Sequence, residues 1–130
     1  MTLEDIYFEC EQKGITVDYF KTDKAKAFSF PYENGIVVLD KSKIETTAEE
    51  TVLLAHEEVH IDLFTTPLTV KGKMEQKVKK HTIKKLIPLD ELKEAVHNGI
   101  TEPWELAEYF NVTNKFMVEA MEFYRDNLLI

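Results

Sequence analysis

The sequence predicts an α+β fold, with an N-terminal helix and a small antiparallel β-meander followed by a helical bundle. Three short strand-like runs, near residues 15–20, 26–30 and 35–39, gather in the first third of the chain. From about residue 47 onward, apolar residues recur at helical spacing. Because strands and helices are segregated along the chain, an alternating β/α architecture is excluded.

The N-terminal elements have clear boundary signals. The first helix begins at Thr2, whose side chain can form a capping box with Asp5, and it ends at Gly14. Between the second and third strand-like runs, Asn34-Gly35 favours a tight hairpin turn, because both residues tolerate positive φ.

The helical part begins with Thr47 and Glu50, which have the spacing of a capping box. Pro67 and Gly72 mark a loop after the first long helix. Helices are predicted over residues 47–64, 73–86, 89–97, 101–110 and 113–128. We therefore divide a single domain, residues 1–130, into a helix-plus-sheet part (about 1–46), a central helical part (47–88) and C-terminal helices (89–130).

Composition and charge exclude several classes of protein. The 130 residues suffice for one domain with a core of its own, and the single cysteine, Cys10, excludes a cysteine-based zinc site. The start of the chain lacks the pattern of a signal peptide, and its apolar runs are too short to cross a membrane. The net charge of −8 disfavours general nucleic-acid binding. We expect a soluble, cytoplasmic protein.

The segment His56-Glu57-Glu58-Val59-His60 carries the chemistry. Two histidines four residues apart lie on one face of a helix, so their imidazoles can converge on one metal ion, and zinc suits such ligands. Glu57 is rotated about 100° from His56, which places its carboxylate beside the ion. From there it can act as the general base for metal-activated water.

A catalytic zinc site needs a third protein ligand, and the candidates are Glu75, His81 and His97. Glu75 is the only acid in a lysine-rich helix, and its helical neighbours Thr82 and Leu86 indicate that its face turns inward. A loop of about ten residues would let this helix fold back on the histidine helix. We therefore expect Glu75 to be the third ligand.

The alternative is a pair of histidines without a metal. Against it, the apolar residues 52–55 precede the motif and indicate a packed helix turn, where imidazoles and a carboxylate are costly unless paired or ligated. Glu58 shares a helix face with Thr51 and Asp62, so we expect Glu58 to be exposed to solvent.

Four segments in this order resemble the ImmA/IrrE family of metallo-endopeptidases, in the short version carried by phages, prophages and mobile elements of Gram-positive bacteria. They read LLAHEEVH at 53–60, KMEQKV at 73–78, KLIPL at 85–89 and ELAEYFNVT at 105–113. Two positions depart from the family pattern: Val59 stands where glycine is frequent, and the stretch 78–82 lacks the usual alanine-rich, aromatic character.

The resemblance implies a zincin-like fold and a zinc-dependent endopeptidase with metal ligands His56, His60 and Glu75 and the catalytic base Glu57. It also implies a protein substrate, a DNA-binding repressor of a phage or mobile element. The alternative function is a non-catalytic zinc-binding regulatory protein that binds a repressor or another regulator without cleaving it.

The C-terminal helices resemble a helix-turn-helix in that family. Residues 101–127 nevertheless hold six acidic and two basic residues, so direct nucleic-acid binding is not expected. The apolar residues there recur at helical spacing and are expected to be mostly core. They are Trp104, Leu106, Ala107, Phe110, Phe116, Met117, Ala120, Met121 and Tyr124.

Overall fold

The computed structural model of the chain describes residues 1–63 and 72–127, and it confirms the α+β class. The helices are α1 (Leu3–Gln12), α2 (Thr47–Asp62), α3 (Lys73–Leu86), α4 (Leu89–His97), α5 (Pro103–Phe110) and α6 (Asn114–Asp126). The strands are β1 (Thr16–Tyr19), β2 (Ala27–Phe30) and β3 (Ile36–Leu39), and a short 3-10 turn, Lys41–Lys43, follows β3. Pro67 and Leu128, predicted to lie in a loop and at a helix end, fall outside the described residues.

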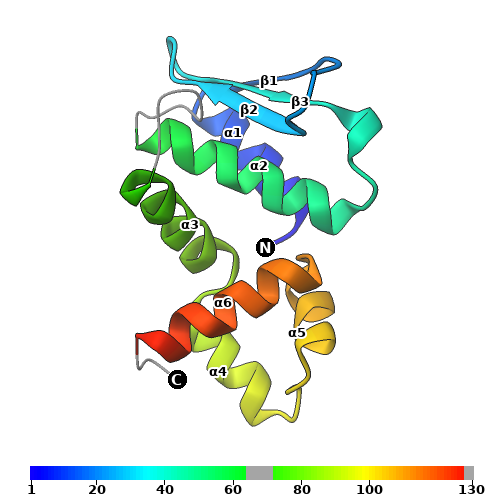
Figure 1. Cartoon of the computed structure of the whole chain (residues 1–130), viewed down its shortest axis with the longest axis vertical. Helices are drawn as coiled ribbons and strands as arrows, with labels where there is room; N and C mark the ends of the chain where they lie inside the picture. Colours follow the sequence, from blue (N-terminus) through cyan, green and yellow to red (C-terminus); the bar gives the residue numbers. More distant parts are fainter. Residues whose placement is uncertain (64–71, 128–130) are drawn as a thin grey trace.

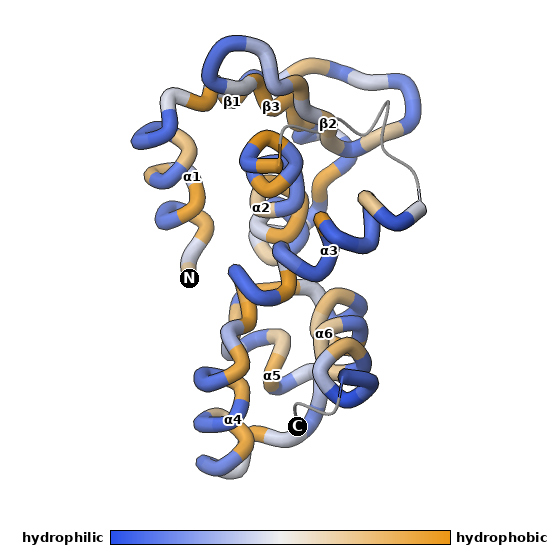
Figure 2. Tube along the Cα trace, turned by 90° about the vertical axis from the view of Figure 1, so that its left-hand side faces the viewer, coloured by the Kyte–Doolittle hydropathy of each residue, from blue (hydrophilic) through white to orange (hydrophobic). Residues whose placement is uncertain are grey.

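The sheet forms one end of the molecule, and the C-terminal helices form the other (Figure 1). Helices α1 and α2 lie against one face of the sheet, and α3 begins near the end of α2 and runs back beneath it. Seen from the side, the described helices all lie on the same side of the sheet, with α2 between α1 and α3 (Figure 2). Helix α2 is therefore the central element of this half of the molecule.

The prediction that the three strands form an antiparallel meander is wrong. The strand order is β1-β3-β2; β3 pairs antiparallel with β2 but parallel with β1. The physical reason lies in the strand sequences. Strand β3 is apolar throughout and largely buried, as a central strand must be, whereas β1 is mostly exposed. The most apolar strand therefore takes the middle position.

The turn between β2 and β3 spans residues 31–35 and places positive φ differently from the expectation. Positive φ occurs at Glu33 and Gly35 rather than at Asn34, and the amide of Gly35 donates to the carbonyl of Tyr32. Gly35 has a φ of 113°, and a Cβ atom there would lie 2.7 Å from Cγ2 of Ile61 in α2. Glycine is thus required both by the backbone conformation and by the close approach of the turn to α2.

The helix N-termini agree with the sequence in one case and differ in another. Helix α1 has the predicted capping box between Thr2 and Asp5. Helix α2 is capped by Thr46, not Thr47, and its side chain accepts a hydrogen bond from the amide of Glu49. Glu50 is instead buried, where its carboxylate accepts a 2.6 Å hydrogen bond from Tyr7 of α1. The capping pair is therefore displaced by one residue from the predicted one, and Glu50 makes a tertiary contact instead.

The C-terminal helices pack on the predicted apolar face, with one correction. Trp104, in the first turn of α5, is exposed, whereas Leu106, Ala107 and Phe110 form the buried face of that helix. Met121 is half-buried. The remaining predicted residues are in the core: Leu106, Ala107, Phe110, Phe116, Met117, Ala120 and Tyr124. The hydroxyl of Tyr124 donates to the carbonyl of Ile87, linking α6 to the segment after α3.

Across the described residues, no helix combines the length and apolar character that crossing a bilayer would require.

Candidate metal centre

The two motif histidines lie one turn apart near the end of α2. The side chain of His60 is fully buried, and that of His56 is partly exposed. Their Nε2 atoms are 3.2 Å apart, and the ring planes are inclined by 71°. The helical spacing has therefore brought both ring nitrogens to one point, as the sequence predicted.

Glu75, in the first turn of α3, completes the group. Its Oε1 atom lies 2.8 Å from Nε2 of His56, and its Oε2 atom lies 3.4 Å from Nε2 of His60. Of the three candidates for a third ligand, the structure thus brings Glu75 to the histidine pair. His81 is exposed on α3, and His97 lies at the end of α4 beside Val96.

The donor set fits a metal ion. One donor atom from each of His56, His60 and Glu75 lies within 4.8 Å of the other two. Donors held at about 2.1 Å from an ion in tetrahedral geometry lie about 3.4 Å from one another, so contacts of 2.8 to 3.4 Å need only a small adjustment. Burial lowers the pKa of both imidazoles, which favours the neutral form that binds metals. This group could hold a metal ion.

Glu57, the predicted base, is buried beside this group. It is 3% exposed, and Oε1 accepts a 2.7 Å hydrogen bond from the hydroxyl of Ser29. Burial raises the pKa of Glu57 to about 7; the bond from Ser29 opposes this rise, and the negative charge of Glu75 adds to it. A carboxyl group with a pKa near neutrality is suited to accept and return a proton.

Ser29 is a residue of the site that sequence reasoning missed. It lies in β2, whose alternation directs Ala27 and Ser29 toward α2 and directs Phe28 and Phe30 to the other face. The available signal was a small polar residue at an inward position of a strand, where a hydrogen-bond partner is needed. No local pattern indicates that the partner is Glu57.

The expectation that Glu58 is exposed is wrong, because its side chain is completely buried. Its carboxylate oxygens lie 2.8 Å from Nζ of Lys13 and 3.2 Å from Nζ of Lys85. The polar residues that share its helix face include Thr51, which is also buried. Both positive charges come from segments outside α2, because Lys13 follows α1 and Lys85 lies in α3. The sequence pattern of α2 alone therefore could not indicate them.

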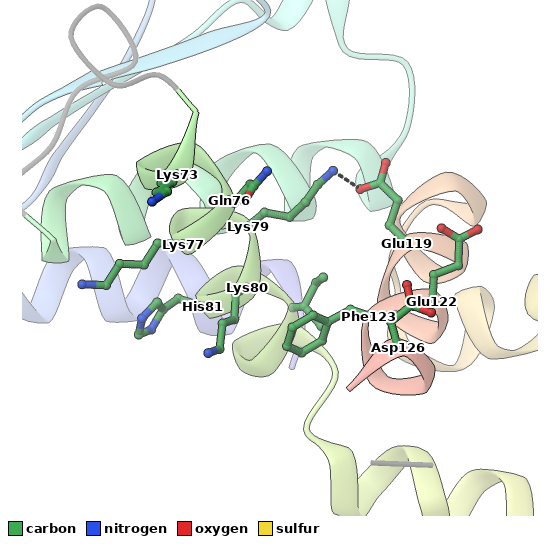
Figure 3. Close-up of a pocket in the computed structure, with 11 residues that line it drawn as sticks. Lys73, Gln76, Lys77, Lys79, Lys80, His81, Glu119, Glu122, Phe123 and Asp126 are labelled. Carbon is green, nitrogen blue, oxygen red and sulfur yellow. Dashed lines mark ion pairs between the residues drawn. The ribbon is translucent and has the colours of Figure 1, made fainter. Parts of the chain in front are cut away.

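The other side of α3 faces α6 across a groove of about 570 Å³ (Figure 3). Lys73, Lys77 and Lys80 line it on α3, and Glu122 and Asp126 line it on α6. An ion pair between Lys79 and Glu119, with the charged atoms 2.7 Å apart, joins the two helices. The lining does not include the metal-binding group, so this groove is separate from the candidate metal centre.

No family model, curated protein or solved structure matches this chain. Any function proposed for the chain therefore rests on the geometry of the site and on the motif resemblance.

Proposed function

We propose that this protein is a zinc-dependent endopeptidase with a zincin-like fold. The observation that supports the proposal most strongly is the convergence of His56, His60 and Glu75, from two helices, beside the buried carboxylate of Glu57. Two imidazoles and one carboxylate form a known type of catalytic zinc site. Zinc bound there would polarise a peptide carbonyl and make water more acidic.

Each residue then has a definite role. His56 and His60 on α2 and Glu75 at the start of α3 would hold the ion. Glu57 accepts the proton of the attacking water and delivers it to the leaving amine. Ser29 holds Oε1 of Glu57, which fixes the orientation of the carboxylate.

The proposed substrate is a DNA-binding repressor of a phage or mobile element, and this part rests on the motif resemblance. The acidic C-terminal helices are consistent with a surface that meets a protein rather than a nucleic acid, because acidic side chains repel phosphates. With such a substrate, the protein would be a cytoplasmic regulator that acts on a partner encoded nearby.

The alternative is a non-catalytic zinc-binding regulatory protein that binds a repressor or another regulator. The observation that favours it is the environment of Glu57, which is 3% exposed and has one carboxylate oxygen bonded to Ser29. A base this enclosed has restricted access to water.

The two functions are separated by zinc analysis and a cleavage assay. The purified protein should contain one zinc per chain, and Glu57→Gln should retain it while losing cleavage of the adjacent-gene repressor by about 10²- to 10⁴-fold. Cleavage that persists in Glu57→Gln would exclude the proposed mechanism. Tight, chelator-insensitive binding of the repressor without cleavage by the wild type would support the regulatory alternative.

A further inference from the structure

Glu58 lies between the two histidines in sequence but on the far side of α2. Two residues of helical rotation, about 200°, separate it from His56. On that side its carboxylate is fully buried between two lysines, Lys13 at 2.8 Å and Lys85 at 3.2 Å. Lys85 also pairs with Glu9 of α1 at 2.5 Å.

A buried cluster of this kind is poorly explained by stability alone. Removing a carboxylate and an ammonium group from water has a large free-energy cost, and apolar side chains of similar size often stabilise such a position as well or better. In some proteins a buried ion pair instead fixes one relative placement of the helices that carry it.

Lys13 and Lys85 connect Glu58 to different parts of the molecule. Lys13 follows α1, so its contact ties α1 to α2. Lys85 lies in the last turn of α3, the helix that carries Glu75. Glu75 and Lys85 are ten residues apart, which is about 15 Å along a helix. Helix α3 is therefore attached to α2 by charged groups at both of its ends, once at the metal-binding group and once at Glu58.

Two attachment points separated by this length fix the direction in which α3 crosses beneath α2 (Figure 2). If the Lys85 end shifts, the helix tilts and the carboxylate of Glu75 moves relative to the imidazoles. Metal ligands tolerate displacements of only a few tenths of an ångström, so the tilt of α3 controls the quality of the site.

We propose that Glu58 and Lys85 are positioning residues that set the tilt of α3 and so hold the carboxylate of Glu75 opposite His56 and His60. This inference rests on the metal site of the proposed function but not on peptidase activity. It gives Glu58 a role in positioning the metal ligands from the opposite side of α2.

The test compares two lysines that pair with the same carboxylate. Lys85→Met and Lys13→Met each remove one of the two positive charges that pair with Glu58. Only Lys85 lies on α3, the helix that carries the metal ligand Glu75. The probe is Co²⁺, whose visible absorption depends on the number and geometry of its ligands. We expect Lys85→Met to weaken Co²⁺ binding by about 10- to 100-fold, the range found when groups that orient metal ligands are lost. The spectrum should change as well, because a tilt of α3 displaces the carboxylate of Glu75 from the two imidazoles.

Lys13→Met should lower stability while leaving Co²⁺ affinity and spectrum as in the wild type. Lys85→Arg, which keeps the charge, should restore both. Lys84→Met, at the neighbouring exposed position, is the control for loss of a lysine from α3. The proposal would be overturned if Lys85→Met bound Co²⁺ with the affinity and spectrum of the wild type. Equal losses of Co²⁺ affinity in Lys13→Met and Lys85→Met would also overturn it.

If Lys85→Met does not fold, the double variant Glu58→Gln/Lys85→Met decides, because it removes the buried charge together with its partner. Weak Co²⁺ binding by a folded double variant supports the positioning role, and wild-type binding refutes it. Failure of the wild type to bind Co²⁺ would refute the metal site of the proposed function itself, which is a different outcome from normal binding by the variants.

Discussion

Ser29 on β2 donates a 2.7 Å hydrogen bond to Oε1 of Glu57 on α2. An edge strand of the described sheet therefore holds the proposed catalytic base through a buried hydrogen bond. This contact joins residues 28 positions apart and couples the integrity of the sheet to the chemistry of α2.

Replacing Ser29 by alanine should weaken both stability and catalysis. A buried carboxylate would lose a hydrogen-bond donor, which typically costs about 1–3 kcal/mol in the free energy of unfolding. Glu57 would also lose its orientation, so turnover should fall more than zinc content does. Urea unfolding, zinc analysis and the repressor-cleavage assay measure these effects. The control is Thr16→Ala, at an exposed position of β1, and a Ser29→Ala variant as stable as this control would contradict the prediction.

Removing the metal should lower the melting temperature, because a ligand that binds only the folded state stabilises that state. At a free zinc concentration 100 times the dissociation constant, the gain is about 2.7 kcal/mol. His56→Ala should abolish the response to zinc and to chelator. His81→Ala, an exposed histidine of α3, should respond as the wild type does. Thermal denaturation with and without zinc provides the measurement, and an unaltered response in His56→Ala would argue against the proposed ligands.

Asn111 should be sensitive to substitution by alanine. It ends α5 in the left-handed conformation, with φ 55° and ψ 48°, which costs about 1–2 kcal/mol for most L-residues. Its side-chain amide also donates to the hydroxyl of Thr51 in α2 at 3.2 Å. We expect Asn111→Ala to lower the free energy of unfolding by about 1–2 kcal/mol. Asn111→Gly tolerates the backbone conformation and should lose less; equal losses in the two variants would show that the conformation is not the cause.

Asp40 should contribute stability that depends on pH. Hydrogen bonds from Ser42 and Thr22 hold the pKa of this carboxyl well below its ordinary value of 3.8. A lowered pKa in the folded state means that the contribution is complete above the ordinary pKa and is lost as the pH falls through the lower, folded value.

The variant Asp40→Asn tests this sign. It keeps one acceptor oxygen but cannot be ionised, so it should be less stable than the wild type at neutral pH. The difference in the free energy of unfolding should shrink as the pH falls below about 4. Denaturant titrations at several pH values measure it. A difference that stays constant down to pH 2 would show that ionisation of Asp40 contributes nothing.

Local pattern was sufficient to predict much of the fold. The bounds of α3 and α4 follow from helical periodicity and from Pro88, and the meeting of His56 and His60 follows from their spacing on one helix. The position of Glu75 in an otherwise basic helix was enough to single it out, and the structure places it at the histidine pair.

The errors arose where distant segments decide the outcome. The strand order depends on which of three short strands is buried on both faces, and single-strand patterns do not determine the pairing partner. Glu58 is buried because Lys13 and Lys85, which are 45 positions before it and 27 after it, supply its counter-charges. Ser29 was missed for the same reason, since its role exists only once β2 lies on α2.

The parallel pairing of β1 with β3 has a consequence for the order of folding. The β2–β3 hairpin joins neighbouring segments and closes a short loop, whereas the β1–β3 pairing brings together residues such as Thr16 and Ile36, twenty positions apart. We therefore expect the hairpin to form first and β1 to dock later.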